Sequence, residues 1–208
     1  MNFRLPHRGA SDPADFAVKF VAARLLGFEK DMKICLTGVP ATDRPGDTHA
    51  YFPALSACCG TLEYLSGLNA GRINPIGLKE ILDFAEHLPA EYSADSVRVL
   101  YEAFRHPVAH RGIASGVWVD RNPAGKGRRL TWSITELKSR PAIDVVDHPG
   151  TLTSDPPWLC AYTHRAFIHL GSLWSDISNS AQLYMGKLAT NKKMQTRFFK
   201  CMDQLYPR

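Results

Sequence analysis

The chain has 208 residues, of which 45% are hydrophobic and 22% are charged, with a net charge of +5. These values are typical of a soluble globular protein with one core, and they argue against two independent domains and against a disordered chain. No apolar run reaches the roughly 18–20 residues that span a bilayer, and Met1 to Arg8 contain no apolar signal core, so we expect a cytoplasmic protein without a membrane partner.

Four helices are predicted in the first half of the chain. The first starts at Asp12, where an aspartate cap precedes a proline, and its apolar stripe continues to Cys35. A polar loop over residues 38–48 precedes a second long helix, a shorter helix covers Ile76–Leu88, and Ser93 caps a fourth. The apolar stripes of the two long helices repeat about every 3.5 residues, which predicts nearly antiparallel packing in a bundle.

The second half is predicted to start with a β-hairpin. Val117–Val119 and Leu130–Ile134 alternate β-branched and aromatic residues on either side of a turn-rich segment. Ile143–Val146 is a candidate third strand, and we treat residues 113–150 as an insertion in the bundle. After a proline-rich stop at residues 155–157, the longest helix carries an apolar stripe from Phe167 to Leu188, and Thr190 caps a final helix.

The segment from Leu100 to His110 is the most informative part of the chain, because it places one arginine and two histidines around a proline. Arginine offers a permanent charge that suits phosphate, and histidine exchanges a proton near neutral pH. On an unbroken helix Arg105 and His110 would point about 140° apart. Pro107 predicts that the helix ends near Phe104 or Arg105 and that a new turn starts, which is the condition for their convergence.

The same residue types also fit simpler structural roles. Arg44 and His49 share the same spacing in a loop, and a histidine before Gly112 is ordinary for the end of a helix. His106 and His110 have the spacing of a two-histidine metal site, but Pro107 interrupts the regular helix that such a site needs. The five cysteines lack zinc-type spacing and are expected to be reduced thiols. We therefore expect no metal and no cofactor.

The segment Arg105-His106-Pro107-Val108-Ala109-His110 resembles the signature of the HEPN superfamily (higher eukaryotes and prokaryotes nucleotide-binding domains). That signature is an arginine, a polar residue, a short spacer and a histidine, after an amphipathic helix. The motif covers six residues, and the helical layout around it covers most of the chain. The resemblance implies a mainly α, HEPN-like up-and-down helical bundle, here a single domain over residues 1–208 with a small β-hairpin insertion. Some toxin-type members carry a tyrosine two residues after the histidine, where this chain has Gly112, so the chemistry of that subgroup is not carried over.

The resemblance also implies a function, a metal-independent endoribonuclease that cleaves single-stranded or looped RNA. The ribose 2′-OH would attack the phosphate, His110 would act as acid or base, and Arg105 would stabilise the phosphate. His106 would assist, and the resemblance implies a homodimer with the site at its interface. For RNA binding we add Tyr101, Arg111 and the basic residues of the predicted hairpin: Arg121, Lys126, Arg128 and Arg129. The alternatives are a catalytically inactive dimeric binding or scaffold module and, less favoured, a metal-dependent hydrolase.

Overall fold

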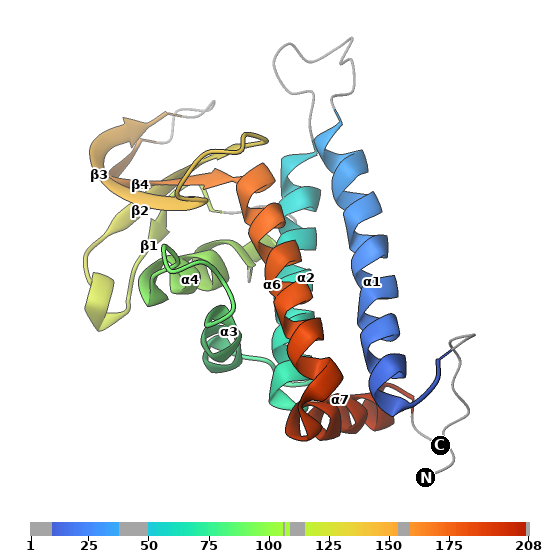
Figure 1. Cartoon of the computed structure of the whole chain (residues 1–208). Coiled ribbons are helices and arrows are strands. Elements are labelled where there is room, and N and C mark those ends of the chain that lie inside the picture. Colours follow the sequence, from blue (N-terminus) through green and yellow to red (C-terminus); the bar gives the residue numbers. More distant parts are fainter. Residues whose placement is uncertain (1–9, 38–49, 106, 109–114, 154–158, 207–208) are drawn as a thin grey trace.

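The computed structural model describes residues 10–37, 50–105, 107–108, 115–153 and 159–206. A group of long helices lies beside a four-stranded mixed sheet, and two short helices occupy the space under the sheet (Figure 1). The protein therefore has an α/β fold. The prediction of a mainly α, up-and-down helical bundle with only a small β-hairpin is wrong, because the sheet has four strands and includes a stretch that was predicted to be helical.

The helical layer is built from α1 (Pro13–Leu36), α2 (Tyr51–Ala70) and α6 (Leu170–Thr190), which pack side by side, while α7 (Lys192–Leu205) crosses their ends (Figure 1). Asp12 caps α1 as predicted, since its Oδ1 accepts hydrogen bonds from the Ala14 and Asp15 amides. The cap of α7 is Asn191 and not Thr190, which is the last residue of α6. Within the described residues, no helix has the length and apolar content needed to cross a membrane.

The short helices are α3 (Leu78–Ala85) and α4 (Ala94–Val99), and α4 continues without a break into η1 (Leu100–Arg105), which is a π-helix. Ser93 caps α4 as predicted, because its hydroxyl accepts a hydrogen bond from the Ser96 amide at 3.0 Å. π-Helical turns are rare and often occur at functional sites. This one carries the arginine of the predicted motif at its last position.

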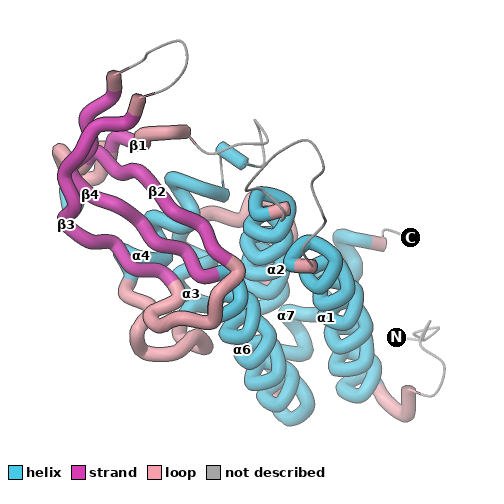
Figure 2. Tube along the Cα trace, turned by 90° about the horizontal axis from the view of Figure 1, so that it is seen from above, coloured by secondary structure: helices cyan, strands magenta, loops and turns pink. Residues whose placement is uncertain are grey.

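The strands are β1 (Trp118–Val119), β2 (Arg129–Thr135), β3 (Ile143–Leu152) and β4 (Cys160–His169), arranged in the order β1-β2-β4-β3. The predicted hairpin is confirmed, because β1 pairs antiparallel with β2, and a short turn, η2 (Pro123–Gly125), lies in the connection. Strand β4 pairs parallel with β2 and antiparallel with β3. Figure 2 shows the sheet at one side of the helical layer. Helices α4 and α6 pack against the sheet, and Phe52 of α2 contacts Trp132 of β2.

Strand β4 is the main error of the sequence prediction. The apolar stripe of the predicted helix was started at Phe167, but the chain is a strand up to His169. Ala166 and Ile168, which are both fully buried, show the two-residue period of a strand. Phe167 lies three residues before Leu170, the first residue of α6. This is a helical spacing, so the apolar pattern around Phe167 fits both a strand and a helix.

Candidate functional site

The predicted break of the helix at the motif falls on His106, which lies outside the described residues, so it stays a prediction. Helix η1 ends at Arg105, and Pro107 and Val108 are helical. His106, His110 and Arg111 lie outside the described residues, so their distances from Arg105 stay untested.

Arg105 lies against α2 and forms a side-on ion pair with Glu63. Its Nε donates to Oε2 at 2.8 Å and its Nη2 donates to Oε1 at 2.5 Å. A side-on pair engages one edge of the guanidinium and leaves Nη1 directed away from that carboxylate. The two side chains are 22% and 23% exposed, so solvent reaches the pair. Burial opposes the charged form, but the bonds and charge of Glu63 raise the pKa of Arg105, which therefore stays a cation.

Tyr101 holds Arg105 from a second side. The Cζ atom of Arg105 lies 5.6 Å from the centroid of the Tyr101 ring, within the range of a cation–π contact. The Tyr101 hydroxyl donates to the Ile76 carbonyl at 3.3 Å, which fixes the ring. The cavity under this pair, bordered by Cys59, is only about 10 Å³. A ligand of Arg105 must therefore approach from the solvent side.

Other catalytic chemistries are weaker at this position. Burial raises the pKa of the nearby Cys59 thiol to about 12, so Cys59 stays protonated at neutral pH and is a poor nucleophile. In the part of the chain that the structure describes, no cluster of three or more histidine, cysteine, aspartate or glutamate side chains is arranged to hold a metal ion.

A second arginine of the same helix, Arg98, is the centre of a buried charge network. Arg98 donates to Asp120 at 3.0 and 2.8 Å, to Asp95 at 2.7 Å and to Glu102 at 2.9 Å. Arg128 joins the network through Asp95 and Asp120. The side chains of Arg98 and Asp120 are 6% and 0% exposed. This network fastens the β1–β2 connection to α4.

The basic residues of the hairpin therefore divide into two groups. Arg128 is committed to Asp95 and Asp120, and Arg129 donates to the Ala161 carbonyl at 2.6 Å, so both hold the fold together. Arg121 and Lys126 are exposed. Sequence reasoning assigned all four to RNA and missed the acidic partners, although Asp95, Arg98 and Glu102 have the three- and four-residue spacing of helical ion pairs.

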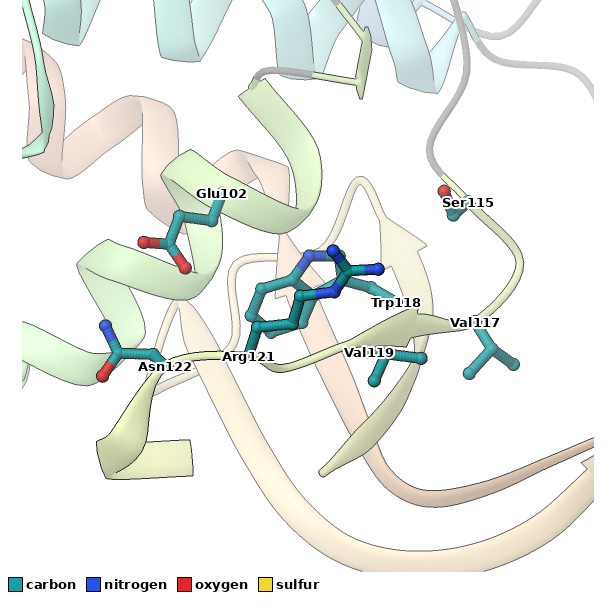
Figure 3. A pocket seen from close by; sticks show the side chains of 7 residues that line it. All are labelled: Glu102, Ser115, Val117, Trp118, Val119, Arg121 and Asn122. Carbon is teal, nitrogen blue, oxygen red and sulfur yellow. The ribbon is translucent and has the colours of Figure 1, made fainter. Parts of the chain in front are cut away.

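A pocket of about 530 Å³ opens between η1 and the chain around β1 (Figure 3). Glu102 of η1 forms one wall, and Trp118 and Arg121 lie on the opposite wall. Ser115, Asn122 and two valines complete the lining. The pocket shares helix η1 with Arg105, and the sequence pattern did not indicate it.

No protein-family model, curated protein or solved structure matches this chain. The case for a function therefore depends on the residues themselves.

Proposed function

We propose that the protein is a metal-independent endoribonuclease in which Arg105 binds the phosphate at the cleavage point of a single-stranded or looped RNA and His110 transfers the proton. The observation that carries the proposal is the setting of Arg105. It is an oriented, permanently charged and partly exposed guanidinium at the end of a π-helical turn. The motif resemblance to HEPN proteins adds the expectation that the histidine five residues later completes the site.

Glu63 has a definite role in this proposal. A free arginine side chain loses rotamer freedom when it binds a phosphate, whereas the ion pair and the Tyr101 ring have already fixed Arg105. The Nη1 side remains directed away from Glu63 and can donate to a non-bridging phosphate oxygen. Charge that develops on the phosphorane-like transition state would then be stabilised by a group that needs no reorganisation.

The reaction needs no group beyond the RNA, Arg105 and His110. His110 takes the proton of the 2′-hydroxyl while the 2′-oxygen forms a bond to phosphorus, and the bond from phosphorus to the 5′-oxygen breaks. The leaving 5′-oxygen then takes that proton from the protonated His110. The products are a 2′,3′-cyclic phosphate, or a 3′-phosphate after hydrolysis, and a 5′-hydroxyl end.

The experiment is RNA cleavage in excess EDTA, with the chemical nature of the product ends determined. We expect cleavage with cyclic or 3′-phosphate ends, and a loss of at least about 100-fold in rate for Arg105→Ala and for His110→Ala. Lys30→Ala, at an exposed lysine of α1, serves as a matched control for the loss of one exposed positive charge. Loss of activity on chelation, or full activity in either site variant, contradicts the mechanism.

A catalytically inactive RNA-binding or scaffold module is the second candidate, and the Glu63 carboxylate is the observation that favours it. A carboxylate bound at 2.5 and 2.8 Å offsets the positive charge that would attract a phosphate. RNA binding without any cleavage would select this candidate. The homodimer remains a prediction, which light scattering at micromolar concentration tests directly.

A further inference from the structure

The pocket between η1 and β1 has the size and chemistry of a small-ligand site. Its volume of about 530 Å³ falls in the range of roughly 300–1,000 Å³ that is usual for ligand pockets. It combines one aromatic ring, one carboxylate and one guanidinium, which belong to Trp118, Glu102 and Arg121. A ring system that carries hydrogen-bond donors and an anionic group is the ligand that complements this set.

The two walls of the pocket are held in place by one buried residue. Arg98 donates to Glu102 at 2.9 Å on one wall, and its Cζ lies 5.8 Å from the Trp118 ring centroid on the other. Arg98 is also fixed by Asp120. The pocket is therefore preorganised, and binding would cost little further ordering of its walls.

The charges of the network around Arg98 favour a ligand that donates hydrogen bonds to Glu102. Asp95, Glu102 and Asp120 supply three carboxylates, which are paired with only two guanidiniums, those of Arg98 and Arg128. Counted over the residues that the structure describes, one negative charge in the network is left over. Glu102 is the member of this set that lines the pocket and is 33% exposed on its side chain.

Among the four RNA bases, guanine fits a carboxylate best. An ionised carboxylate only accepts hydrogen bonds, and guanine alone presents two adjacent donors, N1–H and the N2 amino group, on its Watson–Crick edge. Adenine and cytosine place an acceptor beside their amino group, and uracil places carbonyl oxygens on both sides of its N3–H. Single-stranded RNA is read by stacking on aromatic side chains together with contacts to this edge.

We propose that the pocket binds a guanine nucleotide, with the base against Trp118, its N1–H and N2 donors on Glu102 and a phosphate on Arg121. This inference deepens the proposed function, because it names the base that the nuclease would read near the phosphate held by Arg105. Glu102 and Arg105 belong to the same helix, η1, so one strand of RNA can reach both.

The test is calorimetric titration of the protein with guanosine, adenosine, cytidine and uridine 3′-monophosphates. We expect the guanosine nucleotide to bind at least about tenfold more tightly than the other three. Glu102→Gln should remove that preference, because the amide brings a donor to the position of a charged acceptor. Arg121→Ala should weaken all four nucleotides to a similar extent. Lys30→Ala, which removes an exposed positive charge of α1 from outside the pocket, should change none of them by more than about twofold.

Equal affinity for the four nucleotides, or no binding at millimolar concentration, overturns the proposal. Equal effects of Arg121→Ala and Lys30→Ala overturn it as well, and this comparison holds even if Glu102→Gln destabilises the fold. Cleavage is measured separately. Binding of the guanosine nucleotide by a protein that cleaves no RNA supports the pocket and rejects the nuclease, whereas cleavage without nucleotide binding supports the nuclease and rejects the pocket.

Discussion

Arg98 and Arg105 lie about two turns apart on one continuous helix, and their surroundings differ in kind. Arg98 contacts three carboxylates and its side chain is 6% exposed. Among the described residues, Arg105 contacts one carboxylate and one aromatic ring, and its side chain is 22% exposed. Both side chains are held in one orientation, but only Arg105 combines that order with access from solvent.

This difference separates an arginine that holds a fold together from one that can bind a substrate. A guanidinium surrounded by three carboxylates has its donors engaged and lies in a local excess of negative charge, so a phosphate would be repelled. A guanidinium in a single side-on pair keeps part of its donor set for a ligand. Substitutions at the acidic partners of the two arginines should therefore have opposite kinds of effect.

The largest effect is expected from Asp120→Ala. The change leaves the buried Arg98 guanidinium without its most deeply buried partner, and breaking one side of a buried ion pair typically costs about 3–5 kcal/mol. Urea unfolding followed by circular dichroism measures the loss. Asp203→Ala, at an exposed aspartate of α7, is the control and should change the free energy of unfolding by less than about 0.5 kcal/mol. Similar values for the two variants would mean that the network does not hold the fold.

An intermediate effect is expected from Glu63→Gln, and it is an increase in RNA affinity. The amide oxygen can still accept one bond from Arg105, but the negative charge that competes with phosphate is gone. The slope of log affinity against log salt should become steeper by up to about 0.7, the value for one further phosphate contact on a single strand. Fluorescence anisotropy with a 2′-O-methyl RNA, which cannot be cleaved, measures both quantities.

The matched control is Glu29→Gln, which removes an exposed glutamate of α1. An equal gain in affinity for both variants would show that only the overall charge matters. The proposal for Arg105 requires a larger gain at position 63.

The smallest effect is expected in the acid stability of the Arg98 network. Hydrogen bonds from Arg128, opposed by burial and reinforced by Arg98, lower the pKa of Asp95 to about 2. Burial opposes the charged form of Asp120, but the bonds from Arg98 and Arg128 keep its pKa below the usual value. Because these pKa values are lower in the folded state, the carboxylates add stability above about pH 4, and that stability is lost as the pH falls towards 2.

The melting temperature of the wild type should therefore fall as the pH is lowered from 5 to 2, and that of Asp95→Asn should fall less. The difference is small, since the Asp95 side chain is 39% exposed and solvent screens its charge. Parallel curves of melting temperature against pH for the two proteins would show that Asp95 does not contribute to the acid sensitivity.

The sequence predicted the local features of this molecule better than the distant ones. Caps at Asp12 and Ser93 and the β1–β2 hairpin depend on neighbouring residues, and all three are confirmed. Strand β4 was missed, because the burial of Ala166 and Ile168 depends on pairing with β2, which is far away in the chain.

The same division applies to the candidate site. Helix η1 ends at Arg105, where Pro107 predicted a helix end, and the predicted break itself falls on His106, outside the described residues. The partner Glu63 lies 42 residues away, and no spacing rule connects the two. The commitment of Arg128 to Asp95, 33 residues away, was equally invisible, so a structural arginine was assigned to RNA.

The most direct test of the contrast between the two arginines is a nuclear magnetic resonance titration of the arginine Nε–H signals with a 2′-O-methyl oligouridine, which carries no guanine for the pocket at Glu102. The signals are assigned from the spectra of Arg105→Lys and Arg98→Lys. We predict a saturable shift of the Arg105 signal, while the signal of Arg98, whose donors are held by three carboxylates, stays in place. An unchanged Arg105 signal at saturating RNA, or a shift at Arg98 alone, would contradict the assignment of Arg105 to the phosphate.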